Sequence, residues 1–127
     1  MTISGDTKFD ENVIKYGTGV DLLIHEVCAM PTALANNAVM QRIMDHHTSA
    51  EDVGTVFARA KPKLAAFTHL VLLQTPAIPP VGLDELAART RSNYQGPLVL
   101  GEDLMCFTVG NAVTVHKWDP QRNSYPD

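Results

Sequence analysis

Two short apolar runs, at residues 21–25 and 64–73, constrain the fold of this chain more than any other feature of its sequence. Runs of this length that lack polar alternation are typical of strands buried on both faces of a sheet. Helical patterns separate the two runs, and a third apolar run follows at residues 98–100. Strands that alternate with helices imply crossover connections, so the sequence predicts an α/β fold with a mostly parallel sheet.

Local signals at helix ends and turns place the remaining elements. Residues 2–4 have the pattern of the end of a strand, while Asp10 and Ser49 stand where helix N-caps are expected. Gly110 and Asn111 predict the turn of an antiparallel hairpin. We therefore expect helices at residues 10–16, 32–44, 49–61 and 83–94, the last capped by Asp84 or the preceding turn, and hairpin strands at residues 105–109 and 112–117.

The composition is that of one globular domain. The chain has 127 residues, of which 45% are hydrophobic, and this is enough to build a packed core. We expect one domain over residues 1–118 and a loose polar tail over residues 119–127. Cys28 and Cys106 both stand in apolar segments, and we expect them to be reduced core residues.

Charge and hydropathy exclude several classes of protein. The formal net charge of -4 argues against a broad nucleic-acid surface, although it leaves room for a small phosphate-containing substrate. No apolar run approaches the roughly 18 residues that a membrane-spanning helix needs. Residues 1–6 lack the basic start and apolar core of a signal peptide, so we expect a cytoplasmic protein without membrane partners.

Side chains that can bind a metal stand where the expected strands end. Asp6 lies in a Gly-Asp-Thr turn, His69 interrupts the second buried strand, and Glu26 follows the first apolar run. Histidines and carboxylates at the ends of parallel strands are the ligands that a hydrolytic metal site requires. Taken alone, Asp6 is equally explained as a turn-forming residue, and His69 as a core histidine bonded to a carbonyl group. Their joint placement favours the metal site.

The other histidines have more varied explanations. His47 precedes the helix that begins near Ser49, and an imidazole there can act as a general acid, because helix N-termini favour nearby anions. Glu26 could hold a neighbouring histidine ring in one tautomer. His46 is more simply a solvated residue at the start of the helix, and His116 an ordinary residue of the hairpin.

Four motifs of the chain occur in the same order in the metallo-β-lactamase superfamily. They are the Gly-Asp-Thr turn, the apolar strand that ends in His-Glu, the His-His-Thr-Ser segment before a helix, and the strand with Phe-Thr-His, at residues 4–7, 21–26, 46–52 and 64–69. The chain most closely resembles the ribonuclease Z and arylsulfatase-like branch of that superfamily. The resemblance runs from about residue 2 to residue 71, and the closing hairpin also fits it.

The resemblance implies a fold and a reaction. The fold would be half of a metallo-β-lactamase-type αββα sandwich, with a mixed sheet, helices on one face and a closing antiparallel hairpin. Asp6 would bridge two zinc ions, and His69 would bind the second of them. Glu26 and His47 would match the phosphodiesterase machinery, with His47 protonating the leaving group and Thr48 supporting it. The implied function is hydrolysis of a phosphodiester or related ester by a zinc-activated water.

The chain departs from the family pattern because it has no counterpart of the His-x-His-x-Asp-His motif, which supplies most of the metal ligands. Two ligands remain where a two-zinc site needs about six or seven. We therefore expect the carboxy-terminal half of the family fold, inactive when isolated. It would associate with a second copy of itself, or with a partner that supplies the missing half.

Three other interpretations stay open. A non-catalytic half-domain that self-associates would bind metal weakly or not at all. The triplet Asp45-His46-His47 resembles that of the Asp-His-His phosphoesterases, although a helical stretch precedes it here. A structural α/β domain with scattered histidines is the simplest interpretation. Metal stoichiometry separates the hydrolase from the non-catalytic half-domain.

Overall fold

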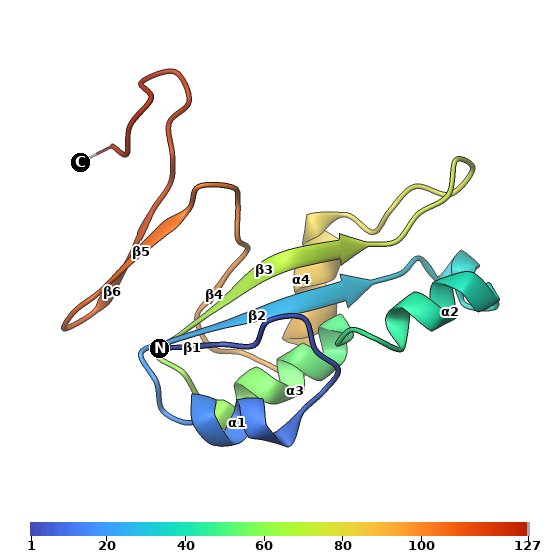
Figure 1. The fold of residues 1–127 in the computed structure, drawn as a ribbon, viewed down its shortest axis with the longest axis horizontal. Coiled ribbons are helices and arrows are strands. Elements are labelled where there is room, and N and C mark those ends of the chain that lie inside the picture. The colour runs from blue at the N-terminus through green and yellow to red at the C-terminus, as the bar shows by residue number, and fades with distance from the viewer. Residues whose placement is uncertain (127) are drawn as a thin grey trace.

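A four-stranded parallel sheet forms the centre of the computed structural model, which describes residues 1–126 (Figure 1). All neighbouring strands are parallel. Their order across the sheet follows the chain, with β1 (Thr2–Ile3), β2 (Leu22–Ala29), β3 (Leu64–Leu72) and β4 (Leu98–Val99). At least one helix connects each strand to the next. The predicted α/β fold with a mostly parallel sheet is confirmed.

One face of this sheet packs against three helices, α1 (Glu11–Gly17), α3 (Ala50–Ala60) and α4 (Leu83–Arg91). The core between them is apolar and fully enclosed, with Leu23, Val27 and Phe67 from the sheet and Val53 and Phe57 from α3. Apolar residues recur on α3 at the three- and four-residue spacing of an amphipathic helix, and this spacing turns one stripe of the helix toward the sheet. Helices on one face of the sheet were expected from the resemblance.

The packing of α3 against α4 depends on one glycine. A Cβ atom at Gly54 would lie 2.5 Å from the backbone carbonyl oxygen of Thr90, closer than a carbon and an oxygen can approach. The two helices therefore touch where α3 has no side chain, and Asn93 adds a hydrogen bond from its side-chain amide to the Glu51 carbonyl oxygen at 3.0 Å.

The predicted N-caps of two helices are confirmed. The Asp10 carboxylate accepts a hydrogen bond from the backbone N–H of Asn12. The Ser49 hydroxyl accepts one from the N–H of Asp52 and donates to the Asp52 carboxylate at 2.8 Å. Both caps are local interactions that short polar side chains make at these positions.

Two helix predictions need correction. Residues 32–44 form a short 3₁₀-helix (Thr32–Leu34) and a separate helix, α2 (Ala38–Met44), because the side chain of Asn37 accepts hydrogen bonds from Val39 and Met40 and starts a new helix. No residue of α2 is buried. The helix at 83–94 ends earlier, at Arg91. Of its two predicted caps, the preceding turn is the one observed, because Gly82 stands at the cap position.

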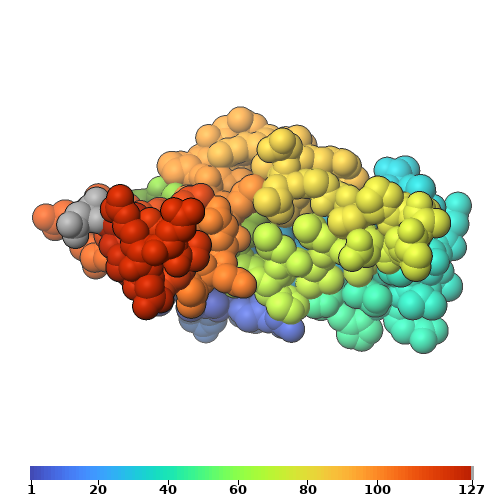
Figure 2. All heavy atoms as spheres, turned by 90° about the horizontal axis from the view of Figure 1, so that it is seen from above, coloured from blue at the N-terminus to red at the C-terminus, as the bar shows by residue number. Residues whose placement is uncertain are grey.

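The closing hairpin consists of β5 (Cys106–Val109) and β6 (Val113–His116), as predicted. It forms its own two-stranded antiparallel sheet and leans away from the parallel sheet (Figure 1). Seen from above, the hairpin and the following residues gather at one end of an elongated molecule (Figure 2). Asp119 pairs with Ser124 within the segment that was expected to be a loose tail, whose last residue, 127, lies outside the described residues.

The two cysteines have different environments, and both thiols are free. Cys28 is buried in β2, and this burial raises the pKa of its thiol to about 11. Cys106 is exposed on β5, so the prediction that it is a core residue was wrong. Its segment is apolar, but the hairpin stands outside the core that the helices cover. Among residues 1–126, none of the helices is long and apolar enough to cross a membrane.

Candidate metal centre

A β-bulge in β3 places the histidine that the sequence singled out. Glu26 pairs with Thr68, but the next residue of β2, Val27, pairs with Leu70, so His69 is an extra residue without a partner in the ladder. Its φ of 43° lies in the left-handed region, which is uncommon for a residue other than glycine. Such bulges re-aim a side chain, and strained backbone of this kind clusters at functional sites.

Glu26 is fully buried and tied to two neighbouring segments. Its Oε1 atom accepts a hydrogen bond of 2.9 Å from the backbone N–H of Thr48, and its own N–H donates to the Ser4 hydroxyl at 3.1 Å. The Thr48 hydroxyl in turn donates to the carbonyl oxygen of Thr7 at 2.7 Å. These bonds hold the loop after β1 and the loop before α3 against the middle of β2.

Two details of this arrangement differ from expectation. Glu26 does not follow the end of its strand, because β2 continues through Val27 to Ala29 by pairing with β3 beyond the bulge. Thr48 contacts the Glu26 carboxylate through its backbone N–H, rather than contacting the His47 ring. The contact of the Ser4 hydroxyl with Glu26 could not be predicted from the sequence, because a serine in a turn carries no distinctive signal.

Glu26 and His47 form a close, buried pair. The Nδ1 atom of His47 lies 3.3 Å from the Oε2 atom of Glu26, and the His47 side chain is only 15% exposed. The two atoms are not aligned for a hydrogen bond, and neither has another hydrogen-bond partner among residues 1–126. Burial raises the pKa of the Glu26 carboxyl group, while the Thr48 N–H and His47 act in the opposite direction. Buried polar atoms without hydrogen-bond partners are rare in proteins, and a bound ion, an ordered water or a catalytic role explains them.

Asp6 and His69 form a second, exposed pair beside the first. The Nδ1 atom of His69 lies 3.2 Å from Oδ1 of Asp6, with the side chains 49% and 65% exposed. The rings of His69 and His47 are 5.6 Å apart. The structure thus brings together four of the residues that the sequence singled out, from the loop after β1, from β2, from the loop before α3 and from the bulge in β3.

The donor atoms of this cluster fit a divalent metal ion. One ligand atom each from Glu26, His47 and His69 lie within 4.8 Å of one another. Neighbouring ligands of tetrahedral zinc are roughly 3.3 Å apart when the bonds are about 2.0–2.1 Å. The separations of 3.3 Å in the Glu26–His47 pair and 3.2 Å in the Asp6–His69 pair match that value. Imidazole and carboxylate donors suit zinc and also other divalent ions.

The remaining histidines lie away from this cluster. His25 is buried on the helix-facing side of β2, where it contacts the edge of Phe57, and burial lowers the pKa of its ring. His116 contacts the Thr108 hydroxyl within the hairpin. His46 donates from Nδ1 to the carbonyl oxygen of Arg42 at the end of α2.

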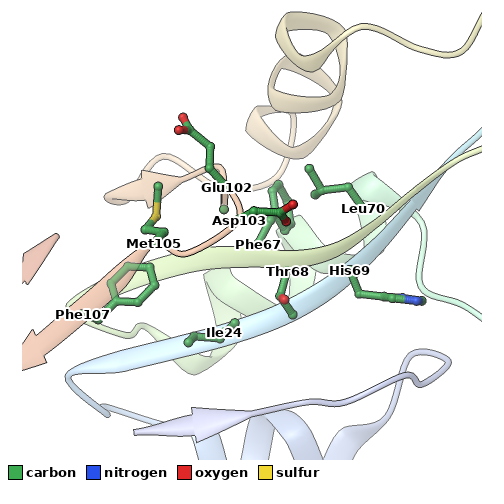
Figure 3. Close-up of a pocket in the computed structure, with 10 residues that line it drawn as sticks. Ile24, Phe67, Thr68, His69, Leu70, Glu102, Asp103, Met105 and Phe107 are labelled. Atoms are coloured by element: carbon green, nitrogen blue, oxygen red, sulfur yellow. The ribbon is translucent and has the colours of Figure 1, made fainter. Parts of the chain in front are cut away.

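A cavity of about 450 Å³ adjoins the cluster at His69. Its lining combines apolar side chains, among them Ile24, Met105 and Phe107, with the acidic Glu102 and Asp103. Figure 3 shows the His69 ring pointing away from Met105 and Phe107. The cavity could not be predicted from the sequence, because its far wall is an irregular loop between β4 and β5.

The fold and the cluster together define a class of structure. A parallel sheet with helices on one face, a separate antiparallel hairpin and a possible Glu/His/His metal site are consistent with half of a metallo-β-lactamase fold. The metallo-β-lactamase fold protein YhfI from Bacillus subtilis has a similar solved structure, with a TM-score of 0.57 and 17% sequence identity. The match covers 79% of this chain and 36% of that chain. No protein-family model matches the sequence, and no curated protein matches it.

Proposed function

We propose that this chain is a metal-dependent hydrolase whose centre consists of Asp6, Glu26, His47 and His69. The observation that carries the proposal is the buried pair of Glu26 Oε2 and His47 Nδ1, which have no hydrogen-bond partner and lie beside a third ligand atom on His69. A divalent metal such as zinc would supply Lewis acidity there and lower the pKa of a water molecule. The metallo-β-lactamase fold of the structural neighbour supports this class of chemistry.

In the assignment that we favour, Asp6 and His69 hold the metal and His47 acts on the leaving group. His47 is 15% exposed, so its ring can reach both a substrate and the buried Glu26. A proton on Nδ1 would face the Glu26 carboxylate, and this would stabilise the protonated ring that a general acid needs. Glu26 is held in turn by the Thr48 backbone N–H. The complete family site would hold two zinc ions, whereas this chain offers fewer ligands than two ions require.

We propose phosphodiesters or related esters as substrates, following the resemblance to the ribonuclease Z and arylsulfatase-like branch. A chromogenic phosphodiester is therefore the first substrate to test. Ligand exchange at a metal and in-line attack on phosphorus both require an open approach, and the exposed Asp6–His69 pair offers one.

Metal content and turnover of three variants test the assignment. Asp6→Ala and His69→Ala should abolish zinc binding measured by elemental analysis, because each removes a ligand. His47→Ala should keep the zinc and lose turnover by about 100-fold or more, the usual contribution of a general acid. His116→Ala is the matched control, because it removes a histidine of the hairpin and should change neither quantity.

Loss of zinc in the His47 variant would overturn the favoured division of roles. It would instead make Glu26, His47 and His69 the ligands of a single metal ion, since their ligand atoms already lie within 4.8 Å. Full turnover in the Asp6 and His69 variants would contradict the hydrolase proposal altogether.

A second candidate function is a non-catalytic half-domain that self-associates. It is favoured by apolar side chains that are exposed outside the helix-covered core, among them Ile3, Leu104 and Val109 at 56%, 61% and 42%. Zinc content distinguishes the two: about two zinc ions per assembled unit supports the hydrolase, and none in a stable assembly supports the half-domain.

A further inference from the structure

A groove distinct from the cavity at His69 borders the candidate centre on the side of α2. It has a volume of about 320 Å³, and its lining consists of Arg42, Ile43, His46 and His47. His47 belongs both to this groove and to the buried pair with Glu26. A group bound in the groove would therefore lie next to the reacting part of a substrate held at the centre.

Of the four residues that line the groove, Arg42 alone carries a permanent charge, and its guanidinium group is unengaged. Within residues 1–126, the Arg42 side chain has no ion pair and donates no hydrogen bond. The other arginines all have polar partners: Arg59 with Glu11, Arg89 with Glu85, Arg122 with Asp119, and Arg91 with the carbonyl oxygens of Tyr94 and Gly96. A free guanidinium group can bind an oxyanion through two parallel hydrogen bonds.

The end of α2 would normally repel an anion, because helix C-termini carry partial negative charge. Here the last carbonyl groups are already occupied. The N–H groups of Asp45, His46 and His47 donate to carbonyl oxygens of α2, and the His46 ring donates to that of Arg42. Asp45, the nearest acidic side chain in sequence, does not line the groove.

We infer that this groove binds an anionic group of the substrate, a phosphate or sulfate that flanks the bond to be cleaved, with Arg42 as the main binding residue. The inference rests on the proposed function, because it assigns the substrate class of the same site. We therefore expect a substrate with a second negative group beside the scissile ester to bind more tightly than one with a neutral group there.

Binding of inorganic phosphate tests the groove without requiring turnover. Titration followed by NMR should shift the signals of the Arg42 and His46 side chains in the wild-type chain. Arg42→Gln should weaken this binding by about tenfold or more, the usual effect of losing a hydrogen bond to a charged group. Lys15→Gln is the control: it removes the same charge from the solvent side of α1, where Lys15 is exposed and lies over the Tyr16 ring, and should leave binding unchanged. Equal affinity in all three proteins would overturn the inference.

Kinetics separate this inference from the proposed function. With two chromogenic phosphodiesters, one carrying a terminal phosphate and one a neutral group, Arg42→Gln should raise KM about tenfold for the first only. Turnover that continues with KM unchanged in the variant would overturn the inference and leave the hydrolase proposal standing. If phosphate binds through Arg42 but neither ester is cleaved, the hydrolase proposal fails while the anion site is supported.

Discussion

Glu26 is the residue at which the stability of this chain and its proposed chemistry oppose each other. A fully buried carboxylate with one unpartnered oxygen disfavours folding, because water no longer solvates its charge. Only one of its two oxygens receives a hydrogen bond, from the Thr48 N–H. A bound cation would compensate the charge, so the same side chain should weaken the metal-free protein and strengthen the loaded one.

Replacing Glu26 by Gln should therefore stabilise the metal-free chain at neutral pH. Burial raises the pKa of Glu26 above its ordinary value of 4.5, so folding favours the protonated form. The stability that this group contributes is fully present at low pH and is lost as the pH rises through the raised pKa. Thermal unfolding in a chelator at pH 7 should show Glu26→Gln more stable by on the order of 1 kcal/mol, with the difference vanishing near pH 4.

Glu51→Gln, on the exposed first turn of α3, is the control for this experiment and should show no comparable pH dependence. A Gln variant that is less stable than the wild type at pH 7 would mean that the buried carboxylate is already compensated in the metal-free chain.

At the residue scale, the sequence identified Asp6, Glu26 and His69 because each interrupts or follows an expected strand. It identified His47 because this residue precedes a helix N-terminus. It could not predict how they meet. The bulge at His69 depends on a left-handed backbone conformation that no local residue pattern announces. Arg42 was not identified either, because an exposed arginine on a helix is ordinary until the groove beside it is known.

At the scale of the elements, the contact between α3 and α4 is the most sensitive point of the fold. Alanine at Gly54 would favour the helix by about 1 kcal/mol. Its Cβ atom would meet the Thr90 carbonyl oxygen at 2.5 Å, and overpacking of this kind costs about 1–3 kcal/mol or more. Since that oxygen belongs to the backbone, it cannot turn away. Gly54→Ala should therefore lower the free energy of unfolding by about 1–2 kcal/mol in a urea titration.

Gly110→Ala is the matched control, since the nearest atom to its new Cβ would be 3.9 Å away. It should change the midpoint of urea unfolding little. Equal stability of the Gly54 variant and the wild type would show that α4 can shift away from α3.

Elements were predictable where their signals are local. The caps at Asp10 and Ser49 are such signals and were confirmed. The expected single helix over 32–44 was wrong in its middle, because Asn37 starts a new helix. None of the residues of this new helix is buried, so no contact with the core fixes its position. The extension of β2 to Ala29 was missed, since His25 and Glu26 break the apolar run although both are buried in the sheet.

At the scale of the whole molecule, the hairpin forms a sheet separate from the parallel one, and apolar side chains on and near it, Leu104 and Val109, are exposed. A two-stranded sheet on its own is marginally stable in water. The match with the structural neighbour covers only 36% of that protein's chain. We propose that a second copy of the chain, packed about a two-fold axis, covers these apolar side chains.

Light scattering over a range of protein concentrations should then give the molar mass of a dimer. Val109→Lys, on the hairpin, should shift the population to monomer, because it places a charge in the apolar contact. Val39→Lys, on exposed α2, introduces the same charge elsewhere and should leave the dimer intact. A monomer at all concentrations, or equal effects of both variants, would contradict this arrangement.

The bulge at His69 adds one residue to β3 without changing which face the later side chains of the strand occupy. An added residue normally turns every later side chain of a strand to the opposite face. In β3 the extra residue is absorbed where it occurs, so Phe67 before it and Leu70 after it both reach the same core. His69 is thus an extra residue that takes no part in the alternation of β3. Its side chain can change without altering which apolar residues of the strand face the core.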